Sequence, residues 1–161
     1  MPIPNGLLLL DRIPIFYFLV LWPISAAIYL LFFYLYAVAS GWRYITRHFR
    51  ALGQPDYRRF RPLHTVIGRG LYQNNVVFSP LSEGLWMEVP LPVRLSHPTL
   101  LVPWHQVSSV VRKRTLFGRF SYTLQLNATH KSISITIYHA ELADLIEVKR
   151  RSAFQTAAPI L

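Results

Sequence analysis

The sequence predicts a single-span membrane protein: one N-terminal transmembrane α-helix followed by a small α+β domain, an antiparallel barrel capped by a C-terminal helix. Three observations predict this layout. No charged side chain occurs in residues 13–42, short stretches after residue 64 alternate between apolar and polar residues, and a helical apolar period appears near the C-terminus. A chain of 161 residues has room for an anchor and one domain.

Residues 13–42 are expected to form the transmembrane helix, because about 20 apolar residues suffice to cross the hydrocarbon core. A signal peptide is the competing interpretation. The apolar stretch is too long for an h-region, however, and Asp11 beside Arg12 nearly cancels a positive n-region. Pro23 is expected to kink the helix or to start a new one, so residues 13–22 either belong to the span or form a separate interfacial segment.

Residues 1–12 precede this span and form an expected interfacial segment. Four consecutive leucines in it have no domain of their own to cover them, so we expect them to contact the membrane interface or a partner: Leu7, Leu8, Leu9 and Leu10. On the helix itself, Tyr29, Phe33 and Tyr36 share one face, which is expected to contact either lipid or a partner helix or pigment.

The net charge is +10, and its location predicts the orientation of the chain. Residues 43–63 are expected to form a basic juxtamembrane helix and linker. Because basic residues gather on the cytoplasmic side of a membrane, the N-terminus should lie outside and the domain in the cytoplasm, at a bacterial inner membrane. These arginines suit anionic lipid at the cytoplasmic surface and require no nucleic acid. The arginines expected to contact the membrane or a partner are Arg43, Arg47, Arg50, Arg58, Arg59 and Arg61.

Residues 64–161 are expected to form the domain, together with its C-terminal helix and tail. The stretch 84–95 should pair with 99–107, and 119–126 with 132–139, as antiparallel strands. The apolar stripe of the helix that starts near residue 140 should close the open end of the barrel. The expected core residues are Trp104, Phe120, Tyr122, Leu124, Leu142, Leu145 and Ile146.

One motif carries a resemblance to a known family. It consists of Gly84-Leu85, then His97-Pro98, then an aliphatic run at residues 100–102 that ends in Pro103-Trp104. Residues 41 to about 111 resemble small single-span bacterial membrane proteins of unassigned function, which are similar in pattern to bacterial pleckstrin-homology-like (PH-like) domains. The resemblance implies that fold and supplies no catalytic residue. Pro103 cannot donate to a further strand, so Trp104 is expected to fold back over the core with its N–H on a carbonyl or water.

The chemistry-bearing residues give no sign of an enzyme. Cysteine is absent, and the six histidines form no helical pair with a carboxylate. We therefore expect no catalytic residue, no metal site and no cofactor, although ligation of a haem by a single histidine needs no motif and stays open. The leading hypothesis is a non-catalytic accessory subunit that stabilises a larger membrane complex, respiratory or photosynthetic, with other membrane-protein subunits as partners. The alternative is a membrane-anchored PH-like module that binds lipid headgroups, with the basic residues 112–114 in a loop.

Overall fold

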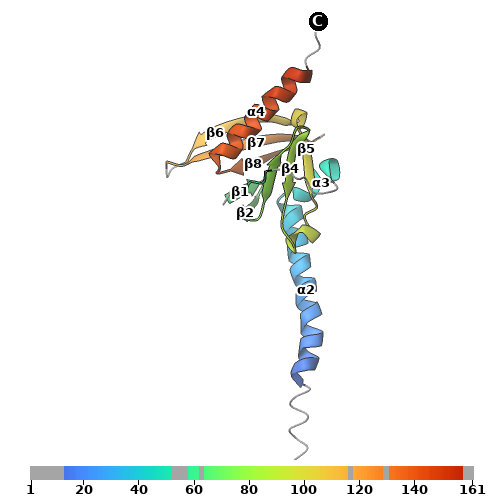
Figure 1. Ribbon diagram of the computed structural model, residues 1–161. Coiled ribbons are helices and arrows are strands. Elements are labelled where there is room, and N and C mark those ends of the chain that lie inside the picture. The colour runs from blue at the N-terminus through green and yellow to red at the C-terminus, as the bar shows by residue number, and fades with distance from the viewer. Residues whose placement is uncertain (1–12, 52–57, 62–63, 116–117, 129–130, 158–161) are drawn as a thin grey trace, which may run out of the picture.

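The computed structural model describes residues 13–51, 58–61, 64–115, 118–128 and 131–157 (Figure 1). An N-terminal helix leads into a two-sheet domain, and a C-terminal helix completes it. The helices are α2 (Ile13–Ala39), α3 (Trp42–Phe49) and α4 (Ala140–Ala157), with two 3₁₀ turns, η1 (Val93–Leu95) and η2 (Trp104–Gln106). The strands are β1 (His64–Ile67), β2 (Gly70–Gln73), β3 (Val77–Pro80), β4 (Gly84–Glu88), β5 (Leu100–Pro103), β6 (Val107–Arg114), β7 (Phe120–Ala128) and β8 (Lys131–Ile137).

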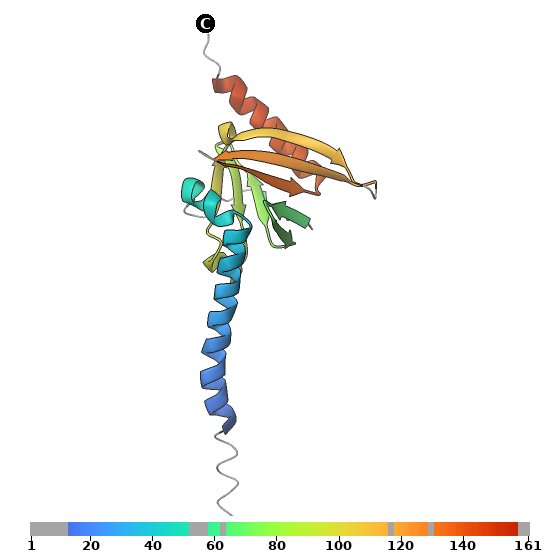
Figure 2. The ribbon, with the colours of Figure 1, turned by 180° about the vertical axis from the view of Figure 1, so that it is seen from behind.

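Helix α2 stands away from the domain as a single rod (Figures 1 and 2). Its stretch Tyr17–Ala39 is long and apolar enough to cross a membrane, and most of its large apolar side chains are exposed. The helix continues through Pro23, so no new helix starts there. It ends at Ala39 rather than at residue 42, because the chain turns at Gly41 and Trp42 begins α3. The leucines at 7–10 and the whole segment 1–12 lie outside the described residues.

The domain contains two antiparallel sheets that are not joined into a barrel. One has the order β2-β1-β8-β7-β6 and the other the order β3-β4-β5. The predicted pairings are confirmed over part of their length: residues 84–87 pair with 100–103, and residues 122–128 pair with 131–137. Residues 93–95, predicted as part of the first strand, form the 3₁₀ turn η1 instead. The expected closed barrel is wrong for the described strands. Residues 112–114, expected in a loop, instead form the end of the edge strand β6, where their charge opposes pairing with another strand.

The two sheets share one apolar core, and α4 covers one end of it. Trp104 follows β5 and is only 2% exposed, and its indole N–H donates to the carbonyls of Leu81 (3.1 Å) and Ser82 (3.0 Å). The buried ring thus keeps a hydrogen bond, as the sequence led us to expect. Of the other expected core residues, five pack in or against this core: Tyr122, Leu124, Leu142, Leu145 and Ile146.

Phe120 is the exception, and its assignment to the core is wrong. Its side chain is 43% exposed, although it alternates in phase with Tyr122. Phe120 is the first residue of β7, and the hairpin of β6 and β7 extends beyond the other sheet and α4 (Figures 1 and 2). The guanidinium of Arg112, 3.6 Å from the ring centroid, stacks on Phe120 instead.

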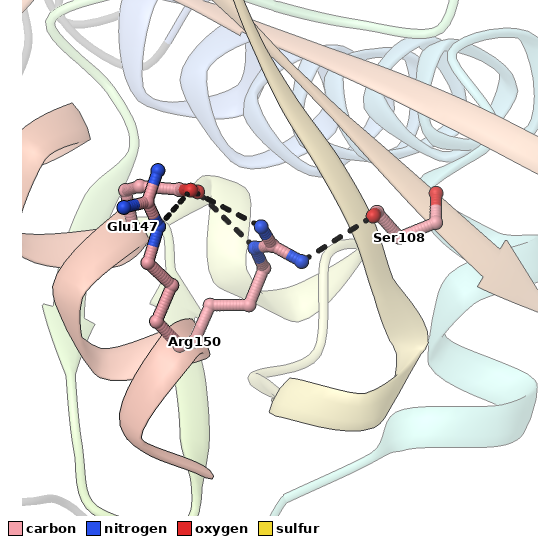
Figure 3. A network of polar contacts seen from close by, with 4 residues as sticks. Ser108, Glu147 and Arg150 are labelled. Atoms are coloured by element: carbon pink, nitrogen blue, oxygen red, sulfur yellow. Dashed lines mark hydrogen bonds and ion pairs between the residues drawn. The ribbon is translucent and has the colours of Figure 1, made fainter. Parts of the chain in front are cut away.

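Helix α4 is tied to the large sheet by a polar network around Glu147 (Figure 3). Arg150 donates twice to the Glu147 carboxylate, both at 3.1 Å, and once to the carbonyl of Ser108 in β6 at 3.4 Å. Arg151 adds a donation of 2.7 Å. Hydrogen bonds from Arg150, opposed by partial burial, lower the pKa of Glu147. The network orients the helix whose Leu142 and Ile146 fill the core.

Candidate functional site

The helix–domain junction is the contact between the end of α2 and residues of β2, η1 and the 96–98 loop. It is the most elaborate polar site among the described residues. It begins where α2 stops. Ser40 N donates to Tyr36 O (2.9 Å), and Gly41 then adopts φ 86°, a left-handed conformation that suits glycine. This turn redirects the chain into α3, whose Trp42 points into the domain and is completely buried.

A chain of hydrogen bonds runs through the buried centre of the junction. Ser96 Oγ donates to Val93 O (2.9 Å), so it accepts from Nδ1–H of His97 (2.9 Å). That leaves His97 Nε2 to accept from the hydroxyl of Tyr72 (3.0 Å), whose oxygen accepts from Ser40 Oγ (2.8 Å). Every polar side-chain atom of this chain therefore has a partner, as buried polar groups require.

A neutral imidazole at His97 with its proton on Nδ1 is consistent with these contacts. The side chain is completely buried, and this burial lowers its pKa to about 4, helped by the positive charge of Arg43 and opposed by a hydrogen bond to the Val93 backbone. Burial also raises the pKa of Tyr72 above its ordinary value. Both groups are thus uncharged at neutral pH, and the chain is a structural network without a charged member.

Aromatic rings enclose this polar chain. Tyr36 of α2 donates its hydroxyl to Leu71 O (2.6 Å) and lies edge-on to Tyr72, with ring centroids 5.3 Å apart. Trp42 donates its indole N–H to Pro98 O (3.0 Å), and its ring lies 5.4 Å from that of His97. Tyr36, which was expected to contact lipid or a partner, thus packs in part on its own domain. Trp42 likewise packs within the domain.

Two glycines let the β1–β2 turn approach the end of α2. A Cβ at Gly68 would lie 2.4 Å from the backbone oxygen of Ser40, and one at Gly70 would lie 2.4 Å from Ser40 Cβ. Gly68 also has φ 55°, which strains any other residue. The sequence pattern Gly-Arg-Gly, which matches no phosphate loop, thus has a packing explanation.

The expected contact residues are distributed over several places. Tyr29 is 42% exposed on α2, and Phe33, one turn on, packs against it with ring centroids 4.5 Å apart. Arg43 lies 4.9 Å from the Tyr34 ring centroid. Arg58 pairs with Glu141 (2.7 Å) and Arg59 with Glu88 (3.8 Å), so two linker arginines contact acidic residues of the domain. The remaining three are exposed side chains: Arg47, Arg50 and Arg61.

A basic cleft of about 340 Å³ lies on one side of the junction. Residues 38–41 at the end of α2 form one wall, and Gly68, Arg69 and residues 131–134 form the other. Lys131 and Arg69 supply positive charge, and Ser132 and Ser134 supply hydroxyls. Such a lining suits a phosphate group at the level of lipid headgroups.

Across the described ranges, the structure gathers no three His, Asp or Glu side chains that could hold a metal ion. Sequence reasoning missed the residues that build the junction, because Ser40, Tyr72 and His97 are brought together only by the sheet topology. Only the His97-Pro98 element of the motif pointed to this region. Comparisons of the chain with protein-family models, curated proteins and solved structures found no match.

Proposed function

We propose that the protein is a non-catalytic accessory subunit, in which α2 anchors a domain at a fixed orientation so that the domain can organise a larger membrane complex. One observation carries this proposal: the buried chain from Ser40 through Tyr72 to His97 fixes the domain to the helix end. A protein that only needed tethering would need no such junction, since a polar linker holds a domain near a membrane. Fixed placement matters where the domain must meet a partner in a defined position.

The finer points of this proposal follow from the charge distribution and the layout. We place the N-terminus outside and the domain in the cytoplasm of a bacterial inner membrane, which the exposed Arg47, Arg50 and Arg61 support. A relation to PH-like domains is supported by two antiparallel sheets with a C-terminal helix across one end. Labelling of a tag at residue 1 from the cytoplasmic side would contradict this orientation.

A partner subunit would contact α2 below the junction. Tyr29 and Phe33 lie on one face, and Ile24 and Leu31 on the opposite face by the helical period of about 100° per residue. Purification from native membranes in mild detergent should give partner subunits at fixed stoichiometry. The pair Tyr29→Ala and Phe33→Ala should lower that yield, whereas Ile24→Ala and Leu31→Ala should not. A protein that purifies alone and monodisperse would contradict the proposal.

The second candidate function is binding of an anionic phospholipid headgroup, and the basic cleft beside Gly41 favours it. Native mass spectrometry in detergent with added phosphatidylglycerol tests it. Arg69→Gln with Lys131→Gln should lower the number of bound lipids and remove their salt sensitivity. Arg112→Gln with Lys113→Gln, at the distant edge strand β6, is the matched control. Equal loss in both pairs would mean that the lipid follows net charge and not the cleft.

A further inference from the structure

Two leucines near η1 are exposed to an unusual degree. Leu91 is 71% exposed and Leu95 is 66% exposed, and no other large apolar side chain described outside α2 is as exposed as Leu91. Single exposed leucines are common on soluble surfaces and need no explanation. These two lie in one short segment, Pro90–Ser96, and the position of this segment relative to α2 explains why both leucines are exposed.

The segment lies beside the membrane helix rather than on the far side of the domain. Figures 1 and 2 show the short yellow-green turn η1 next to the upper part of α2, lower than most of the two sheets. Val93 lines a small apolar cleft together with Phe32, Phe33 and Tyr36 of α2. Leu71, which is 51% exposed, borders the same cleft.

The distance of this contact from the C-terminal end of α2 follows from the rise per residue of an α-helix. Phe32 and Phe33 precede the last helical residue, Ala39, by six or seven positions, or about 10 Å at 1.5 Å per residue. The 27 residues of α2 measure about 40 Å, whereas the hydrocarbon core is about 30 Å thick. Centring the helix would leave about 5 Å outside the core at each end, which would place the cleft residues Phe32, Phe33 and Tyr36 between the hydrocarbon boundary and about 5 Å inside it.

The backbone of the segment is suited to such a place. Arg94 N donates to Pro90 O (3.1 Å) and Leu95 N to Pro92 O (3.2 Å). Ser96 N (3.1 Å) and His97 N (3.2 Å) both donate to Val93 O, and the two prolines have no N–H to satisfy. Consecutive backbone donors are thus paired within the segment. An unpaired backbone N–H is costly in an apolar surrounding, so this pairing lowers the cost of placing the turn at the edge of the acyl chains.

We propose that the segment Pro90–Ser96 inserts into the acyl-chain edge of the bilayer, in the leaflet that contains the C-terminal end of α2. Leu91 and Leu95 contact lipid, and Val93 contacts the helix. Arg94, which lies 4.0 Å from Glu88, has a long side chain that would reach up to the headgroups. The inference rests on α2 as the membrane span. It gives the domain a second membrane contact besides the helix, which fixes its tilt.

The absence of cysteine makes a direct test possible, because a single introduced cysteine is the only labelling site. Leu91→Cys and Leu95→Cys are each labelled with the environment-sensitive fluorophore NBD in the full chain. The labelled protein is reconstituted into vesicles of phosphatidylcholine and phosphatidylglycerol, with and without lipids brominated high in the acyl chain. Leu31→Cys on α2 is the lipid-exposed reference, and Val111→Cys on β6 is the exposed control outside the membrane.

The proposal expects blue-shifted emission at both leucine positions and a loss of fluorescence to brominated lipid similar to that at Leu31. Val111 should show neither. Emission and quenching at 91 and 95 that match Val111 would overturn the insertion while leaving the span intact. A blue shift without quenching would also overturn it, because a second protein copy would then cover the segment. Absence of quenching at Leu31 would refute the span itself.

Discussion

Replacing Gly68 by alanine tests the helix–domain junction at its closest contact. Gly68 lies in the β1–β2 turn at φ 55°, and an added Cβ would lie 2.4 Å from the backbone oxygen of Ser40. Gly118 is a matched control, because it also has a positive φ, 74°, but an added Cβ would meet nothing within 4 Å. The two substitutions therefore share the backbone strain and differ only in the contact with the end of α2.

The magnitudes follow from these two effects. An alanine forced into the left-handed region costs about 1 kcal/mol, so Gly118→Ala should lower the free energy of unfolding by about that amount. Gly68→Ala adds an overpacking cost of about 1–3 kcal/mol, because the clash is with backbone and not with a flexible side chain. We expect a total of about 2–4 kcal/mol for Gly68→Ala.

Urea unfolding of the full chain in detergent micelles measures both values. Tryptophan fluorescence reports the transition, since Trp42, Trp86 and Trp104 are buried in the domain. Comparable slopes with different midpoints would assign the difference to stability. Equal midpoints for the two alanine variants would refute the packing of the β1–β2 turn on Ser40, and with it the fixed orientation of the domain.

Three further predictions use the same measurement. Tyr72→Phe should destabilise the domain by about 1–3 kcal/mol, because His97 Nε2 loses its donor, whereas Tyr138→Phe at an exposed position should change little. Trp104→Ala should cost about 3–5 kcal/mol because it empties a buried site, and a loss below 1 kcal/mol would contradict the core position of that ring. Stability should fall as the pH drops from 6.5 towards about 4, because the unfolded chain then protonates His97 while the folded chain does not, with a maximum loss of about 3 kcal/mol. His97→Gln should flatten this window, and an unchanged pH profile in that variant would contradict the buried neutral imidazole.

The sequence predicted the elements whose pattern is local. The alternation from Tyr122 to Leu126 and the apolar stripe of α4 both come from the period of a single strand or helix, and the structure contains both elements. The pairing of β4 with β5 also followed, because a hairpin-like order along the chain brings neighbouring strands together. The length of the uncharged stretch was by itself enough to predict helix α2.

The junction could not be predicted in the same way, because its contacts join residues far apart in sequence. Ser40 and Tyr72 are 32 positions apart, and Tyr72 and His97 are 25 positions apart. Their meeting depends on β2 lying at an edge of the large sheet beside α2, which no local period specifies. The misplacement of Phe120 has a similar cause, since alternation gives the face of a strand but not how far the covering layer extends. Tyr36 was predicted to contact lipid or a partner because the domain that packs around it was not visible in the sequence.

The junction and the segment Pro90–Ser96 together bear on how tilt is transmitted between helix and domain. Gly41 is the hinge-like position between α2 and α3, yet Trp42 directly after it is buried and hydrogen-bonded to Pro98. A bend at Gly41 would have to break the Ser40–Tyr72 and Tyr36–Leu71 hydrogen bonds, which join the end of α2 to the domain, so the domain must follow the helix. Pro98 and Ser96, which hydrogen-bond to Trp42 and His97, directly follow η1 in the chain. Turn η1 contacts α2 at a level further from the C-terminal end of that helix. Any partner that tilts α2 would therefore move Leu91 and Leu95 relative to the membrane surface, and any force on the domain would reach the helix through the same residues.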